Sequence, residues 1–125
     1  MKMAAMAELK IKRVYEAAEP GDGLRILVDR LWPRGIAKEK AGIDLWLKGL
    51  SPSDALRKRF HGHPDDWAEF RQAYAEELKA QEAQEAVATL REHMAKGPVT
   101  LIYAAKDETK NNALALKLWL EQPTA

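Results

Sequence analysis

The sequence predicts a single α/β domain whose short, mainly parallel sheet of three or so strands is packed by about five helices. The chain has 125 residues, which suits one domain, and 46% of them are hydrophobic, enough for a buried core. Candidate segments run in the order strand, strand, several helices, strand, helix. A long helical crossover separates the second and third strands, and such connections join parallel strands. We therefore expect one domain over residues 9–122, preceded by a flexible leader, residues 1–8.

Two strands are predicted before the helices. Leu9 to Tyr15 begins with alternating apolar and basic residues, which is typical of an exposed or edge strand. Residues 19–23 form a turn cluster with two glycines available for positive φ, and Leu24 to Val28 is a nearly continuous apolar strand. Only about eight residues separate the strands, too few for the usual parallel crossover. The two strands are therefore either antiparallel neighbours or separated in the sheet.

The middle of the chain is predicted to be helical. Residues 43–50 indicate a short apolar helix or turn. Ser51 can cap the next helix, with Pro52 in its first turn and Asp54 complementing its dipole. A longer helix follows residues 64–66, and its recurring large residues predict a core face: Trp67, Phe70, Tyr74 and Leu78. A further helix carries Ala83, Val87, Leu90 and Met94, and Gly97-Pro98 ends it.

The end of the chain predicts a central strand followed by a last helix. Val99 to Ala104 is almost entirely apolar, as expected of a strand covered on both faces. Thr109 can cap an amphipathic helix that carries leucines from residue 114 to residue 120.

Composition excludes several classes of function. The net charge is +1 and the pI is about 8.0, which gives no general attraction to nucleic acid. The sequence has no cysteine, which excludes disulfides, thiolate zinc sites and thiol nucleophiles. Glu8 and Lys10 interrupt the mildly apolar start, and no stretch is apolar enough to span a membrane. We expect a cytoplasmic protein without a cofactor; the sequence does not indicate an oligomeric state.

Charged and aromatic residues follow the second strand directly, in the run Asp29-Arg30-Leu31-Trp32-Pro33-Arg34-Gly35. Ligands of open α/β sheets bind at the carboxyl ends of strands. Lys106 follows the third strand and, with the free amides of the next helix, would form an anion-binding corner. If the two strands are parallel neighbours, these cations converge on a small anionic ligand with a phosphate or carboxylate group. The predicted ligand-binding residues are Arg30, Trp32, Arg34, Lys106, Asp107 and Asn111.

Two residues are candidates for acid–base chemistry, Asp29 and His61. Whether the ligand is also turned over stays open at this point. A structural role for Asp29 carries about equal weight, because a buried carboxylate can bind loop amides or pair with Arg34. Asn111 is likewise compatible with a simple place at a helix start. The segment His61-Gly62-His63 lacks the spacing of a helical metal motif, so no metal site is predicted.

A second hypothesis is a non-enzymatic module that binds nucleic acid or a protein. It would use the run Arg57-Lys58-Arg59 and an exposed Trp32 loop, with one helix and turn imitating a helix-turn-helix. The following helix is rich in Asp and Glu, which phosphates repel, so this hypothesis is not favoured. The basic run is better explained as a solvated face or a pocket wall.

Several runs together resemble a known family. They are residues 12–15, 27–35, 56–62, 70–74, 101–107 and 111–114, and the Asp-Arg-Leu-Trp-Pro-Arg-Gly run is the most specific. They resemble the YeaO-like branch of the domain of unknown function 488 (DUF488) from Lys10 to Glu121. The resemblance implies a compact α/β fold and supplies no established activity or cofactor.

Labels attached to that family find little support in these residues. Transcriptional regulator is one, and it agrees only with the second hypothesis above. Porphyrin methyltransferase is another, but Gly21-Asp22-Gly23 precedes a strand, whereas a glycine-rich cofactor loop would follow one. Broader relatives often carry cysteines after the last strand, where this chain has Ala104-Ala105, so thiol chemistry does not transfer.

Overall fold

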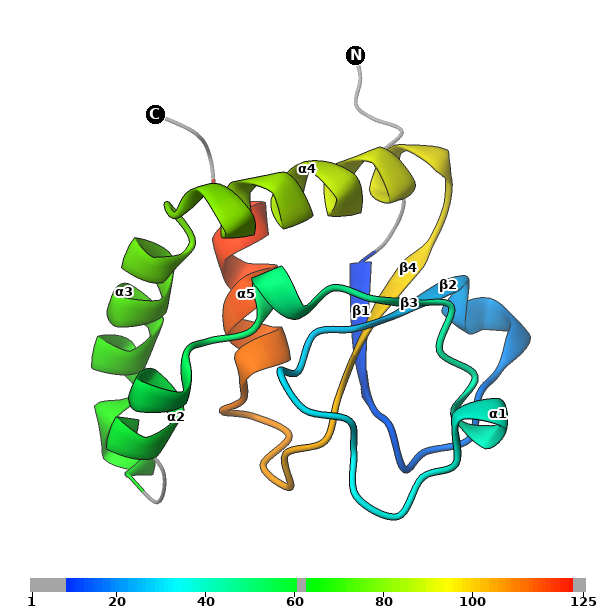
Figure 1. The fold of residues 1–125 in the computed structure, drawn as a ribbon, viewed down its shortest axis with the longest axis horizontal. Coiled ribbons are helices and arrows are strands. Elements are labelled where there is room, and N and C mark those ends of the chain that lie inside the picture. Colours follow the sequence, from blue (N-terminus) through cyan, green and yellow to red (C-terminus); the bar gives the residue numbers. More distant parts are fainter. Residues whose placement is uncertain (1–8, 61–62, 123–125) are drawn as a thin grey trace.

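The computed structural model describes residues 9–60 and 63–122, which form one four-stranded parallel sheet with helices around it (Figure 1). The strands are β1 (Leu9–Arg13), β2 (Leu24–Leu27), β3 (Leu45–Trp46) and β4 (Val99–Tyr103). The α-helices of this part are α1 (Lys38–Ala41), α2 (Asp54–Phe60), α3 (Trp67–Glu77), α4 (Gln81–Lys96) and α5 (Asn112–Glu121). Short 3₁₀ turns cover Pro20–Asp22, Lys48–Leu50 and Pro64–Asp66. The predicted α/β class and helix number are confirmed, with one strand more than expected.

The strand order is β1-β4-β2-β3, so the last strand in sequence lies at the centre. Val99 pairs with Leu9 on one side and with Leu24 on the other. The predicted parallel pairing of β2 with β4 is confirmed. Of the two arrangements left open for the first strands, separation in the sheet is the one found, because β4 lies between β1 and β2.

The segment predicted as a short apolar helix or turn contains β3 instead, followed by a 3₁₀ turn. Leu45 pairs with Ile26, and the Leu47 amide donates to the Leu27 carbonyl at 3.0 Å. The free edge of β2 therefore decides the conformation of this segment, and the local apolar pattern is overridden.

The sheet is covered on both faces, as the apolar strands predict. Val99, Leu101 and Tyr103 of β4 belong to the larger core cluster, which contains the buried residues of α3, α4 and α5. Ile102 faces the other way, into a smaller cluster with Ala41 of α1. Figure 1 shows α3, α4 and α5 grouped together and α1 away from them. No helix in the described part of the chain is long and apolar enough to cross a membrane.

Two helices begin at residues other than those predicted. Ser53, and not Ser51, caps α2: its hydroxyl accepts from the Leu56 amide at 3.0 Å and donates to the Glu77 carboxylate at 2.6 Å. The Ser51 hydroxyl donates backwards to the Lys48 carbonyl instead. At α2, therefore, the serine that has a tertiary partner, Glu77 of α3, is the one that caps the helix.

Candidate functional site

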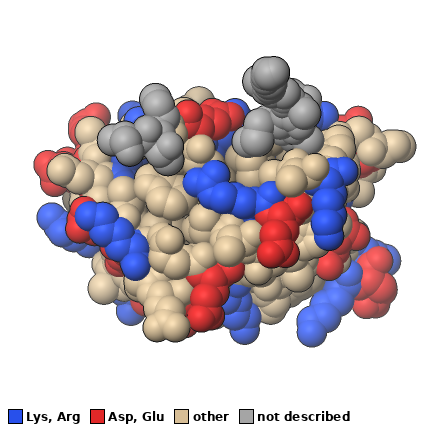
Figure 2. All heavy atoms as spheres, turned by 90° about the horizontal axis from the view of Figure 1, so that it is seen from above, with Lys and Arg blue, Asp and Glu red and all other residues tan. Residues whose placement is uncertain are grey.

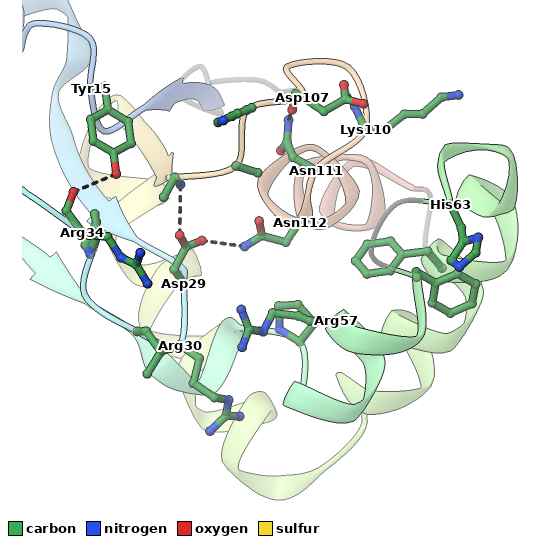
Figure 3. A pocket seen from close by; sticks show the side chains of 18 of the residues that line it. Tyr15, Asp29, Arg30, Arg34, Arg57, His63, Asp107, Lys110, Asn111 and Asn112 are labelled. Carbon is green, nitrogen blue, oxygen red and sulfur yellow. Dashed lines mark hydrogen bonds between the residues drawn. The ribbon is translucent and has the colours of Figure 1, made fainter.

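A pocket of about 800 Å³ opens where β1, β2 and β4 end, beside the start of α5 and the turn between α2 and α3 (Figure 3). We call it the sheet-edge pocket. Its lining comes from residues 29–34, 104–107 and 110–112, together with Tyr15, Pro52, Arg57, Phe60, His63, Trp67 and Phe70. The volume lies in the range of small-molecule sites.

The sheet-edge pocket brings together the predicted site residues that the structure describes. All of them line it: Asp29, Arg30, Trp32, Arg34, Lys106, Asp107 and Asn111. Parallel strands β2 and β4 end side by side, and this places the two distant segments on one rim. His61 lies outside the described residues. The roles of all these residues in binding or chemistry stay predictions.

Asp29 is held by two hydrogen bonds at the end of β2. One carboxylate oxygen accepts from the Ala104 amide and the other from the Asn112 side chain, both at 3.0 Å (Figure 3). Burial raises the pKa of Asp29, while these hydrogen bonds and the charge of Arg57 act in the opposite direction. The structural role for Asp29 through a loop amide is therefore confirmed. The alternative ion pair between Asp29 and Arg34 is absent among the described residues.

Arg57 is one of the lining residues that the sequence-based site list missed, as are Lys110 and Asn112. Its guanidinium points toward Asp29 across the sheet-edge pocket (Figure 3), and it pairs with Asp54 at 2.6 Å. The wall interpretation of the basic run is thus right for Arg57. A sequence signal existed, since Arg57 precedes Phe60 by three residues and so lies on the same side of α2.

The residues of the loop after β2 differ in their exposure and in whether they face the sheet-edge pocket. The second hypothesis required an exposed Trp32, but Trp32 is half-buried. Its indole donates to the Ile36 carbonyl at 2.6 Å and packs edge-on against the Trp46 ring, with the ring centroids 5.5 Å apart. Leu31 is the exposed large hydrophobic residue of this loop, at 64%. The Arg34 carbonyl accepts from the Tyr15 hydroxyl at 3.0 Å, leaving its guanidinium toward the sheet-edge pocket (Figure 3).

Arg30 differs from Arg34, because its guanidinium points away from Asp29 in Figure 3. Its Nε atom is buried and, among the described residues, has no hydrogen-bond partner.

The start of α5 lies later in the chain than the sequence predicted. Asn111, and not Thr109, caps α5, accepting from the Leu114 amide at 2.7 Å. The Asp107 carboxylate accepts from the Thr109 and Lys110 amides, both at 2.9 Å. Hydrogen bonds from Thr109 lower the pKa of Asp107. The amides of Thr109, Lys110 and Leu114 are therefore satisfied by the chain itself.

An aromatic wall lines the other side of the sheet-edge pocket, and we define it as Phe60, Trp67 and Phe70. The rings of Trp67 and Phe70 stack with centroids 5.8 Å apart. The residues predicted to form the core face of α3 therefore fall into two groups. Tyr74 and Leu78 are core residues, each 1% exposed, whereas the wall residues are half-buried and line the pocket. The Tyr74 hydroxyl donates to the Leu50 carbonyl in the core.

Basic residues dominate the charged lining of the sheet-edge pocket. Five are basic, Arg30, Arg34, Arg57, Lys106 and Lys110, and two are acidic, Asp29 and Asp107. By contrast, acidic and basic side chains are interspersed on the face over α4 (Figure 2). With a net charge of only +1, the excess of positive charge in the pocket is local. No group of three or more His, Asp or Glu residues in the described part is placed to hold a metal ion.

Comparison with known proteins gives a match over almost the whole chain. A family model described as the inactive DUF488-N3 subclade matches residues 8–125. The uncharacterised protein YeaO of Escherichia coli K12 is 52% identical over 112 residues, covering 90% of this chain and 96% of YeaO. An uncharacterised protein of Mycobacterium tuberculosis H37Rv is 36% identical over 114 residues, covering 91% of this chain and 94% of that protein. No solved structure matches the chain.

Proposed function

We propose that this chain, which belongs to the YeaO-like DUF488 family, binds a small anionic ligand in the sheet-edge pocket. The ligand carries a phosphate or carboxylate group. The observation that carries the proposal is the excess of Arg and Lys over Asp in the lining. Cations within one partly buried pocket attract anions more strongly than the same charges spread over a surface.

The state of these cations supports the proposal. Among the described residues, only Arg57 of the five has an ion-pair partner, Asp54. Most of the positive charge is thus not neutralised by the protein. Arg34 and Arg57 offer planar guanidinium groups, which bind phosphate and carboxylate oxygens in pairs.

The proposal is for binding without turnover. Asp29, one of the two predicted acid–base groups, has a structural role, because it accepts hydrogen bonds from Ala104 and Asn112 at the end of β2. The description of the matching family model as inactive agrees with this assignment. A cytoplasmic location is proposed with it, since a chain without cysteine suits a reducing compartment.

Calorimetric titration and thermal shift with phosphate, pyrophosphate and citrate test the proposal. A ligand that binds only the folded state raises the melting temperature. We expect binding that weakens about tenfold or more in Arg34→Ala and Arg57→Ala, the cost of a lost charge-assisted hydrogen bond. The matched controls Lys38→Ala and Lys58→Ala remove exposed cations outside the pocket and keep wild-type affinity.

Two results would overturn the proposal. One is the absence of binding to every anion tested. The other is duplex DNA binding that Arg57→Ala and Arg59→Ala abolish and Arg34→Ala leaves unchanged, which would instead support the nucleic-acid module.

A further inference from the structure

We infer that the ligand of the sheet-edge pocket is a nucleoside phosphate, with its base against the aromatic wall and its phosphate at the Arg34 side. This inference rests on the proposed anion binding and deepens it. It commits to a ring, a polar linker and an anionic group in one molecule.

The aromatic wall provides the first argument. Phe60 ends α2, and Trp67 and Phe70 come from the first turns of α3, so the packing of α2 against α3 brings three rings together. All three rings line the pocket and are partly buried against the core. Planar bases stack on such rings, and each stacked base strengthens binding by about tenfold or more.

Exposed apolar side chains provide an independent argument. Among the described residues, the large hydrophobic side chains that are exposed are Tyr15, at 46%, and Leu31, at 64%. Both line the sheet-edge pocket. Apolar surface collected at one concave site indicates a ligand with an apolar part.

The order of groups across the pocket provides the third argument (Figure 3). Arg34 and Tyr15 lie at one side and His63, in the turn between α2 and α3, lies at the other. Asp29, Asn112 and Arg57 occupy the space between them. The middle part of a ligand that reaches both sides of the pocket therefore lies beside these hydrogen-bonding side chains. A sugar with hydroxyl groups fits that position, since a carboxylate accepts from hydroxyls and a guanidinium donates to them.

The test compares ligands that differ by one part. Each nucleoside 5′-monophosphate is titrated calorimetrically beside ribose 5-phosphate, which lacks the base, and beside the nucleoside, which lacks the phosphate. We expect the best nucleotide to bind about tenfold or more tighter than ribose 5-phosphate, as one stacked base provides. Arg34→Ala should weaken the nucleotide and leave the nucleoside unchanged.

Variants of the aromatic wall locate the base. Trp67→Leu should reduce nucleotide affinity to that of ribose 5-phosphate, while Trp67→Phe keeps a ring and retains most of the affinity. Trp119→Leu is the control, because Trp119 is a half-buried tryptophan of α5 outside the sheet-edge pocket. Should Trp67→Leu fail to fold, the wild-type ratio of nucleotide to ribose 5-phosphate and the Trp67→Phe variant decide the question.

The outcomes separate the inference from the proposed function. Equal affinity for the nucleotides and ribose 5-phosphate, with no effect of Trp67→Leu, overturns the inference and leaves anion binding intact. Nucleosides that bind as tightly as nucleotides also overturn it, because the phosphate then adds nothing. Failure of every anion to bind overturns the proposed function and the inference together.

Discussion

The side-chain amide of Asn112 donates to the Asp29 carboxylate at 3.0 Å and joins the first residue of α5 to the end of β2. The same amide group donates to the Val28 carbonyl at 3.2 Å. The other Asp29 oxygen accepts from the Ala104 amide just after β4. The floor of the sheet-edge pocket is thus fixed by one carboxylate that binds two neighbouring segments.

Replacing Asn112 should raise the pKa of Asp29 further. Burial already places that pKa above the ordinary 3.8, and the Asn112 hydrogen bond opposes the shift. Because the pKa of Asp29 is raised in the folded state, its contribution to the free energy of unfolding is present below pH 3.8. That contribution is lost as pH rises through the folded-state pKa. Asn112→Ala should therefore lose about 1–3 kcal/mol of stability, with a larger loss at pH 7 than at pH 3.

Carbon-detected NMR titration of the Asp29 carboxyl, together with urea unfolding at the two pH values, measures both effects. Glu92→Gln on the exposed side of α4 is the control. An Asp29 pKa that falls or does not move in Asn112→Ala would contradict the assigned hydrogen bond.

Asp22 should make the protein sensitive to acid. Burial alone would raise the pKa of Asp22, but hydrogen bonds from Lys12, the Glu19 amide and Arg25 lower it to about 2. The contribution of Asp22 to the free energy of unfolding is then present above pH 3.8 and is lost as pH falls through about 2. Asp22→Asn should destabilise the protein by on the order of 3 kcal/mol at pH 7, because Lys12 and Arg25 lose their buried partner.

Urea unfolding from pH 7 down to pH 2 checks this expectation. The stability difference between wild type and Asp22→Asn should shrink below pH 4, and exposed Glu39→Gln should change stability little at any pH. A constant difference across the range would show that Asp22 does not act through its charge.

A matched pair of glycines tests the connection before β2. Gly23 has φ +66°, and a Cβ atom there would lie 2.2 Å from the Pro98 carbonyl oxygen. Gly21, two residues away, has Lys10 Nζ as its nearest neighbour at 3.8 Å. Gly23→Ala should cost about 2–5 kcal/mol from strain and overpacking, whereas Gly21→Ala should change stability by about 0.5 kcal/mol or less. Similar melting temperatures for the two variants would contradict the close approach of residue 23 to β4.

The cap of α5 can be assigned by comparing two substitutions. Asn111→Ala should cost about 1–2 kcal/mol, because the Leu114 amide loses its partner and the buried side chain loses its bond to the Asp107 carbonyl. Thr109→Ala should cost less, since Thr109 is exposed and its hydroxyl contacts only the loop carboxylate of Asp107. Denaturant unfolding of both variants provides the measurement, and a larger loss in Thr109→Ala would return the cap to Thr109.

Most of the fold could be predicted because its signals are local in the chain. The apolar runs of β2 and β4 and the helical crossover between them determine a parallel pair. Strand β3 could not be predicted, because Leu45–Trp46 is extended only through its pairing with β2. The cap of α2 differs from the predicted one by two residues for a similar reason. Glu77 of α3 selects Ser53, and no pattern near Ser53 in the sequence encodes that contact.

The sheet-edge pocket was predictable in part. Two segments that follow neighbouring parallel strands must meet, and this placed Arg34 and Lys106 on one rim. Arg57 and the aromatic wall depend on how α2 and α3 dock beside α5, which is a tertiary arrangement. The start of α5 was also misjudged, because the Asp107 carboxylate binds the Thr109 and Lys110 amides in the loop before the helix.

The position of β4 has a consequence for biosynthesis. β1 pairs only with β4 in the described part of the chain, and Leu9 lies opposite Val99. A nascent chain that has not reached Val99 therefore carries its first strand without a pairing partner. Such an unpaired edge invites association with other chains until translation supplies its neighbour. The ribosome must deliver nearly the whole domain before its first strand can be incorporated.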